Sequence, residues 1–152
     1  MLTKRFKIVP SSYIILIRAN KILLSKRFNT GFMDGKYGLA AGHGERNESF
    51  TQTIIREAKE EANIILKAKD LKVIHVMHRR EMQINPELRE RVDIFFTAKK
   101  WQGKIKNMEL NKCNDLNWFP VDKLPPNTIP YIKFAINNIQ KKIFYSEFGY
   151  KK

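Results

Sequence analysis

The chain has 152 residues, 43% of them hydrophobic, and a formal net charge of +14. This length fits one domain, and the apolar content can build a core, which excludes an intrinsically disordered chain. The single cysteine, Cys113, excludes an intrachain disulfide and is typical of a reducing compartment. The basic charge suits a polyanionic partner, but the lysines are scattered along the chain, so the sequence does not favour dedicated nucleic-acid binding.

The N-terminal apolar run is short. It covers residues 13–17 before Arg18 interrupts it. A signal peptide needs about 7–15 apolar residues in a row and a membrane span needs about 20. We therefore expect a cytoplasmic protein that does not bind or cross a membrane.

The first half of the chain predicts a hairpin, a loop and a helix. Apolar and β-branched runs at 11–18 and 21–28 indicate two strands joined by a turn at Arg18–Asn20. Three glycines between 28 and 38 predict a loop, with a brief strand at 37–42. A helix is expected over 49–63, with two alternative starts: a capping box of Ser49 with Gln52, or an N-cap at Asn47.

The second half predicts three strands and a closing helix. The strands are expected at 71–78, at 91–101 and, as the last short strand, at 116–125. Isoleucines at helical spacing predict the helix over 128–143. Hairpins combined with two helices predict an α/β fold, a sandwich in which helices cover a mixed β-sheet.

Three glutamates in the first helix form an acidic face beside its apolar stripe. With Glu57 at 0° and about 100° per residue, Glu60 falls at about 300° and Glu61 at about 40°. Carboxylates this close repel one another, and partial burial increases the repulsion. A divalent cation would relieve it, because Mg²⁺ prefers oxygen ligands. The alternative is a solvated helix face with Arg56 and Lys59 as counter-charges.

The spacing of the charged residues resembles the Nudix box, G-x5-E-x7-R-E-U-x-E-E-x-G-U, where U is a bulky apolar residue. Gly42, Glu48 and the pair Arg56-Glu57 match it, as does the pair Glu60-Glu61. Two positions depart from it. Asn63 stands at the final glycine, where asparagine can also adopt positive φ, and Ala58 is small for its apolar position.

This resemblance, which extends from about residue 13 to 143, implies a single Nudix hydrolase domain over 1–152 with an α/β/α sandwich. It implies Mg²⁺ or Mn²⁺ as cofactor, held by Glu57, Glu60, Glu61 and the carbonyl of Gly42. Arg56 would orient the glutamates through ion pairs, with Glu48 as a partner. One glutamate would also accept the proton of the attacking water, and the sequence leaves open which one.

Four further residues are candidates from the resemblance or from their position. Arg27 matches a substrate-contacting position in MutT-like enzymes, or else is a solvent-facing strand residue. Asn127 matches a base-reading asparagine, or else caps the last helix. His43 lies beside the metal loop and would meet substrate. Glu109 is either an auxiliary metal ligand or an exposed loop residue. His75 and His78 face opposite sides of a strand and do not form a zinc pair.

The leading functional hypothesis is a pyrophosphohydrolase that converts nucleoside triphosphates, including oxidised purine nucleotides, to the monophosphate and pyrophosphate. The alternatives are removal of pyrophosphate from RNA 5′ ends, which the +14 charge favours modestly, and a non-catalytic module that senses nucleotides or RNA. The expected partner is a nucleotide substrate, and the expected state is a monomer or homodimer.

Overall fold

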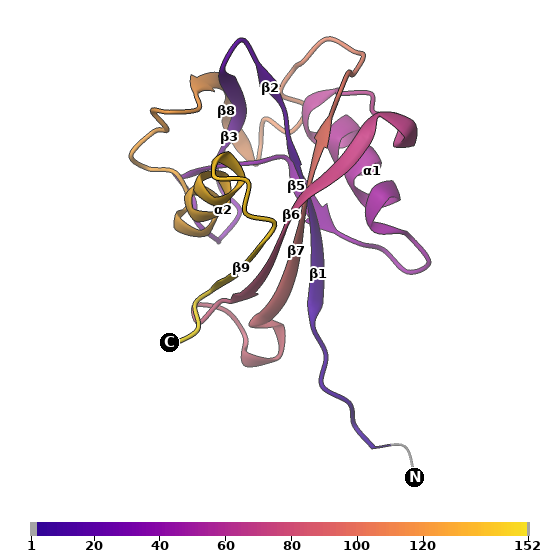
Figure 1. The fold of residues 1–152 in the computed structure, drawn as a ribbon, viewed down its shortest axis with the longest axis vertical. Coiled ribbons are helices and arrows are strands. Elements are labelled where there is room, and N and C mark those ends of the chain that lie inside the picture. The colour runs from indigo at the N-terminus through magenta and orange to yellow at the C-terminus, as the bar shows by residue number, and fades with distance from the viewer. Residues whose placement is uncertain (1–2, 152) are drawn as a thin grey trace.

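The protein is described by a computed structural model over residues 3–151. Its strands form two sheets, flanked by two long helices (Figure 1). The strands are β1 (Val9–Ile15), β2 (Ile17–Arg18), β3 (Lys21–Arg27), β4 (Tyr37–Gly38), β5 (Ala41–His43), β6 (Leu71–Arg80), β7 (Glu90–Ala98), β8 (Cys113–Pro120) and β9 (Tyr145–Phe148). The helices are α1 (Phe50–Ala62) and α2 (Pro130–Gln140), with 3₁₀ turns at Ala68–Asp70 and Pro86–Leu88.

The larger sheet is mixed and has the order β5–β1–β7–β6–β9. β1 pairs antiparallel with β5 and parallel with β7, while β6 pairs antiparallel with β7 and parallel with β9. The smaller sheet contains β2, β3 and β4, with β8 paired to β3. The expected α/β/α sandwich with mixed strands is therefore confirmed, with its strands divided between two sheets.

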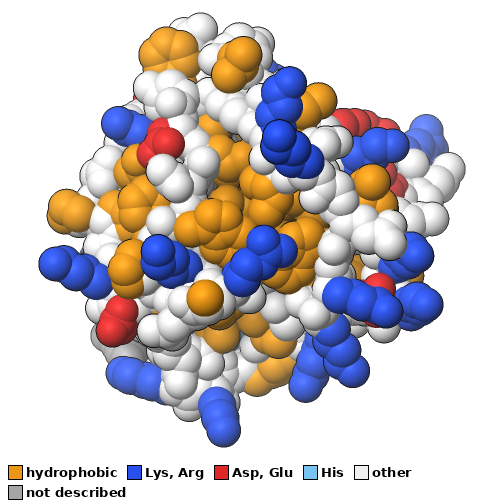
Figure 2. Space-filling view, turned by 90° about the horizontal axis from the view of Figure 1, so that it is seen from above, with side chains coloured by type: hydrophobic (Ala, Val, Ile, Leu, Met, Phe, Trp, Pro, Cys, Tyr) orange, Lys and Arg blue, Asp and Glu red, His pale blue; other side chains and the backbone are white. Residues whose placement is uncertain are grey.

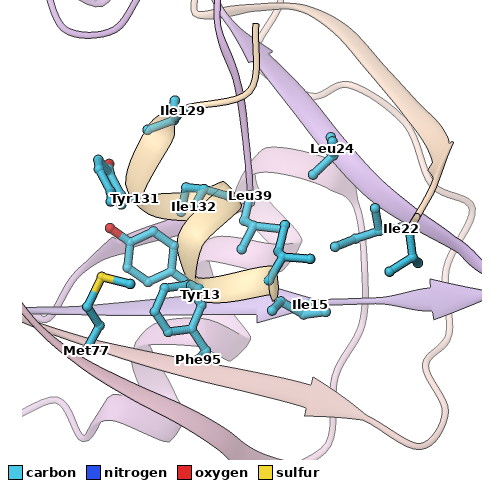
Figure 3. Close-up of a cluster of buried hydrophobic side chains, with 13 residues drawn as sticks. Tyr13, Ile15, Ile22, Leu24, Leu39, Met77, Phe95, Ile129, Tyr131 and Ile132 are labelled. Atoms are coloured by element: carbon cyan, nitrogen blue, oxygen red, sulfur yellow. The ribbon is translucent and has the colours of Figure 1, made fainter. Parts of the chain in front are cut away.

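Two apolar clusters hold the layers together. On one face of the larger sheet, Ile14 and Phe96 pack with Ile54 and Ala58 of α1. The opposite face carries a second cluster, which α2 and β3 cover (Figure 3). Its central buried side chains are Tyr13, Ile15, Ile22, Leu24, Met77, Phe95, Ile132, Ala135 and Ile136. Successive residues of β1 and β7 point to opposite faces, so one pair of strands supplies both clusters.

The local sequence of α1 determines both of its ends. Ser49 is the N-cap, its hydroxyl accepts from Gln52 N, and the Gln52 side chain accepts from Ser49 N, which completes the predicted capping box. Asn47 is not the cap and lies in the preceding turn at φ 64°. At the other end Asn63 takes the left-handed conformation, with φ 57°. The asparagine thus fulfils the role of the glycine in the box.

Three expectations about the strands and the last helix need correction. The first strand, expected over 11–18, divides between the two sheets after Ile15, although its hairpin to β3 through Ala19 and Asn20 is as predicted. The segment 116–125 is not the last strand, because β9 follows α2 and joins β6. The closing helix ends at Gln140, where Lys142 adopts φ 58° and redirects the chain into β9.

No helix within residues 3–151 is long and apolar enough to cross a membrane.

Substitution at Asn63 tests the end of α1. The Asn63 side chain also donates to the Lys104 carbonyl at 2.9 Å. We expect Asn63→Ala to lower the free energy of unfolding by about 1–2 kcal/mol, because alanine tolerates positive φ poorly and the bond is lost. Asn63→Gly should cost less, because glycine adopts this conformation freely. Urea unfolding of the three proteins measures the order, and equal losses for both substitutions would contradict it.

Candidate active site

The glutamates of α1 lie along a cleft of about 800 Å³ between the two sheets. This volume is in the range of sites for small molecules. Glu57, Glu60 and Glu61 line the cleft together with the turn of β5 at Gly42. The side chain of Glu57 is 16% exposed and that of Glu60 is 53% exposed. The helix therefore presents one carboxylate deep in the wall and one at its rim.

Gly42 has no side chain because a carboxylate occupies the space. A Cβ at this position would overlap the Glu57 carboxylate group. The close approach brings Glu57 against the β5 backbone, the same backbone whose carbonyl we expect to bind the metal. The glycine of the box is thus required by the contact between strand and helix, and its φ lies outside the left-handed region.

Glu61 is anchored from β5. Its Oε2 accepts from Ala41 N at 3.0 Å. Burial, reinforced by the neighbouring Glu57 carboxylate, raises the pKa of Glu61 to about 8. Burial also raises the pKa of Glu57, although Arg56 opposes the shift. Negative charge in this wall of the cleft is therefore only partly compensated by the protein.

Arg56 is the main positive charge that compensates these glutamates within the protein. Its Nε and Nη2 donate to the two oxygens of Glu48 at 2.8 and 2.9 Å, and its Nη1 donates to Glu57 at 2.8 Å and to Glu60 at 3.3 Å. The Arg56 bonds, with help from the Thr53 hydroxyl, lower the pKa of Glu48 to about 2. The predicted pairing of Arg56 with Glu48 is present, and it fixes the guanidinium beside the glutamates.

The donor set suits a hard divalent cation. It consists of carboxylate oxygens and a backbone carbonyl, and the raised pKa of Glu61 marks a place where positive charge is lacking. Within residues 3–151, no group of three carboxylate, imidazole or thiol side chains is arranged to hold a metal ion. Mg²⁺ commonly uses one or two carboxylates and takes its other ligands from water and substrate phosphates, so the residues fit this ion.

Arg27 lies across the cleft, at the end of β3. Its Nε donates to the Phe32 carbonyl at 2.7 Å and its Nη2 to the Thr30 hydroxyl at 3.1 Å. Asp34 in turn accepts from the backbone of Thr30 and Gly31. The loop between β3 and β4 therefore holds the guanidinium at the cleft wall. Its contact with substrate stays a prediction.

His43 also lines the cleft, at the end of β5. Arg91 Nη2 donates to its Nε2 at 3.0 Å, so the proton is on Nδ1, which donates to Ser11 Oγ at 3.0 Å. Burial and the Arg91 charge lower the pKa of His43. A neutral imidazole with a fixed tautomer therefore borders the metal loop.

Asn127 and Glu109 are placed differently. Asn127 is not among the cleft-lining residues, and its amide donates to the Gly35 carbonyl at 2.9 Å. It does not cap α2, whose N-cap is Ile129. Its contact with substrate stays a prediction. Glu109 lines the cleft, and its charge contributes to raising the pKa of both Glu57 and Glu61. Its role as an auxiliary metal ligand stays a prediction.

The remaining histidines and Cys113 have structural partners. His75 is buried between the Ile143 carbonyl and the Ser146 hydroxyl, whereas His78 contacts Tyr150 and Glu90. The two side chains therefore have separate surroundings. Burial raises the pKa of the Cys113 thiol, which makes it a poor nucleophile.

Sequence reasoning missed a buried arginine at the far end of the cleft. Arg79 of β6 is 2% exposed and donates from Nε to Asp93 at 2.6 Å, and its guanidinium lies 3.8 Å from the Tyr131 ring centroid. Within residues 3–151, the buried donors Arg79 Nη1 and Arg91 Nε have no hydrogen-bond partner. Both arginines line the cleft. His75, Met77 and Arg79 occupy every second position of β6 and are all buried. This period-2 pattern was the signal in the sequence that Arg79 faces the interior.

Comparison with known proteins agrees with this geometry. A family model of the NUDIX domain matches residues 7–137. The chain belongs to the NUDIX family, and the expected membership is thereby confirmed.

Similar solved structures show the same fold. A MutT NUDIX hydrolase from Burkholderia pseudomallei superposes with a TM-score of 0.77 at 22% identity, over 86% of this chain and 97% of that one. The MutT protein from Methanosarcina mazei Go1 superposes with a TM-score of 0.73 at 15% identity, over 92% and 98% of the two chains. At these identities the likeness concerns the fold alone.

The curated relatives are longer proteins than this chain. The chain is 28% identical over 120 residues to a protein of Pseudomonas aeruginosa described as NAD-capped RNA hydrolase NudC. It is 29% identical over 120 residues to the protein of the same description from Pseudomonas fluorescens. The alignments cover 79% of this chain and 39% of each relative, so the chain spans about two fifths of their length.

Gly42→Ala tests the contact between β5 and α1. The added methyl group would displace the Glu57 carboxylate, so we expect Mg²⁺ affinity to fall by about 10- to 100-fold, as for other residues that orient metal ligands. The control is Gly44→Ala, where the new Cβ would lie 3.3 Å from Thr53 Oγ1. Titration calorimetry compares the two folded variants. Equal Mg²⁺ affinity in wild type and Gly42→Ala would rule out the proposed contact as a determinant of the site.

Proposed function

We propose that the chain is a divalent-metal-dependent pyrophosphohydrolase that converts nucleoside triphosphates, including oxidised purine nucleotides, to the monophosphate and pyrophosphate. The observation that carries the proposal is the convergence of Glu57, Glu60 and Glu61 with Gly42 on one wall of a cleft of about 800 Å³. The cleft continues past Arg27 to the aromatic rings of Tyr13 and Tyr131, which gives it an acidic end and an aromatic end.

The residues divide the chemistry among them. Glu57, Glu60, Glu61 and the Gly42 carbonyl would hold the cation, and Arg56 keeps the glutamates in place. A bound Mg²⁺ ion supplies a more acidic water and neutralises phosphate charge. One of the glutamates accepts the proton of the attacking water as the phosphoanhydride bond breaks and pyrophosphate leaves. Arg27 stabilises the charge on the phosphoryl oxygens, a role that requires a donor already fixed in position.

A second candidate is hydrolysis at the 5′ end of RNA. Two observations favour it: the similarity to proteins described as NAD-capped RNA hydrolases, and the net charge of +14. Both candidates use the same glutamates and differ only in the group attached to the diphosphate.

Glutamine substitutions test the catalytic assignment. We expect Glu60→Gln and Glu61→Gln to lower product release by at least about 100-fold, because each removes a ligand charge or the proton acceptor. The assay measures Mg²⁺-dependent release from normal and oxidised nucleoside triphosphates, ADP-ribose, dinucleoside polyphosphates and triphosphorylated RNA. Glu147→Gln, an exposed carboxylate of β9 outside the cleft, is the control. Undiminished activity in both cleft variants would exclude the metal mechanism, whereas no Mg²⁺-dependent release from any substrate by the wild type would support a binding module.

Metal addition tests the site without turnover. A ligand that binds only the folded chain at about 100 times its Kd stabilises the chain by about 2.7 kcal/mol. We expect Mg²⁺ to raise the melting temperature of the wild type in this way and to have a much smaller effect on Glu61→Gln. Without metal, Glu61→Gln should be no less stable than the wild type, because the substitution removes one of the carboxylates that repel each other. Equal stabilisation of both proteins by Mg²⁺ would place the ion elsewhere.

A further inference from the structure

A lysine-rich loop leads away from the cleft. The loop connects β7 to β8 over residues 99–112, and its single carboxylate, Glu109, lines the cleft. All of its lysines are exposed, and within residues 3–151 none lies within ion-pair distance of a carboxylate. These are Lys99, Lys100, Lys104, Lys106 and Lys112. The loop therefore presents several cations without counter-charges.

Backbone hydrogen bonds attach this loop to α1 and the residues after it. Ile65 and Gln102 exchange two bonds at 2.9 and 3.0 Å, Lys106 N donates to the Ala62 carbonyl at 3.1 Å, and Met108 N donates to the Glu61 carbonyl at 3.1 Å. The loop thus runs along the C-terminal end of the helix that carries the catalytic glutamates, and Lys112 at its end lines the cleft. Because these hydrogen bonds fix the loop backbone, the lysines follow one path over the surface from the region of Trp101 to the cleft.

An aromatic pair stands at the outer end of this path. The Trp101 and Trp118 rings are stacked, with centroids 6.4 Å apart and planes at 26°. The exposed Arg18 guanidinium lies over both rings, 4.8 Å from the Trp101 centroid and 5.5 Å from that of Trp118. A guanidinium over tryptophan rings and exposed to solvent can meet a further planar group, and nucleobases stack on both arginine and aromatic surfaces.

The surrounding surface has the same character. Figure 2 views the molecule from the upper end of Figure 1 and shows apolar side chains at the centre of this face with Lys and Arg side chains around them. Ile17 and Ile65 are 45% and 42% exposed. A shallow depression beside Trp101 is bordered by Lys67 and Lys100 together with one carboxylate, Asp70. A solvated lysine surface would account for the positive charge. It would not account for the exposed Arg18 over the two tryptophan rings.

We propose that Arg18, Trp101, Trp118 and the lysines of residues 99–112 form a binding surface for single-stranded RNA, whose 5′ end enters the catalytic cleft. The lysines contact successive phosphates, and the Arg18 platform stacks a base. The combination of a cationic track with stacking groups matches a single strand better than an acidic protein, which has no bases to stack, or a duplex, whose bases are already paired. The entry of the 5′ end rests on the proposed hydrolase function; binding of the strand does not.

The binding test separates this surface from general charge. A single-stranded RNA of about 12 nucleotides, within the usual site sizes, is labelled at its 3′ end and titrated in EDTA, with fluorescence anisotropy as readout. We expect the triple variant Lys100→Gln, Lys104→Gln, Lys106→Gln to bind at least about tenfold more weakly. Its slope of log affinity against log salt should be smaller by about 2, at roughly 0.7 for each single-strand phosphate contact.

The matched control removes three lysines elsewhere. Lys133, Lys141 and Lys151 are exposed on α2, at its end and near the C-terminus. Their triple replacement by glutamine should leave RNA affinity within about twofold, whereas an equal loss in the two triple variants would overturn the proposal in favour of net charge. Arg18→Gln should weaken binding to the RNA and leave binding to poly-glutamate unchanged. Equal or tighter binding of poly-glutamate or of duplex RNA by the wild type would also overturn it.

Hydrolysis separates this proposal from the proposed function. With 5′-triphosphorylated RNA, the Lys100, Lys104, Lys106 variant should show a KM raised about tenfold and an unchanged kcat, while its KM for a nucleoside triphosphate stays constant. RNA binding with the expected variant effects but without hydrolysis of any substrate would uphold the surface and reject the catalytic function. Hydrolysis of nucleotides without measurable RNA binding would reject the RNA surface and uphold the catalytic function.

Discussion

The contact between Glu57 and Gly42 is the constraint on which the site depends. It brings α1 against the edge strand of the larger sheet closely enough that a side chain on the strand would overlap the carboxylate. The same approach places Glu61 on the Ala41 amide. Carboxylates that would otherwise separate are thereby held together in a partly buried wall. Arg56 neutralises only part of their charge, and the remainder is an electrostatic preference for a cation.

The cleft combines this anionic wall with cationic and aromatic groups at its other boundaries. Arg27 is held by the carbonyl and hydroxyl of its own loop, so its charge is fixed before any ligand arrives. At the far end, Arg79 pairs with Asp93 and with Glu81 and faces Tyr131. Within residues 3–151, its Nη1 has no hydrogen-bond partner. A ligand with phosphates at one end and a planar group with acceptors at the other complements this distribution of charge.

The parts that sequence predicted best are those governed by local interactions. The capping box at Ser49 and the left-handed Asn63 are set within a few residues, so the end of α1 and the shared face of its glutamates could be predicted from the sequence. The choice between Ser49 and Asn47 as N-cap could not. The division of the first strand between two sheets, and the return of the chain in β9, depend on pairing between distant segments. Arg79 was missed for the same reason, because its partner Asp93 lies on another strand and its burial depends on α2.

Anomalous diffraction from crystals grown with Mn²⁺ tests the central claim most directly. The account predicts one strong peak bordered by the Gly42 carbonyl and by carboxylate oxygens of the Glu57–Glu61 turn, with Arg56 still bonded to Glu48. A peak coordinated only by residues outside this turn, or no peak at saturating Mn²⁺, would contradict it.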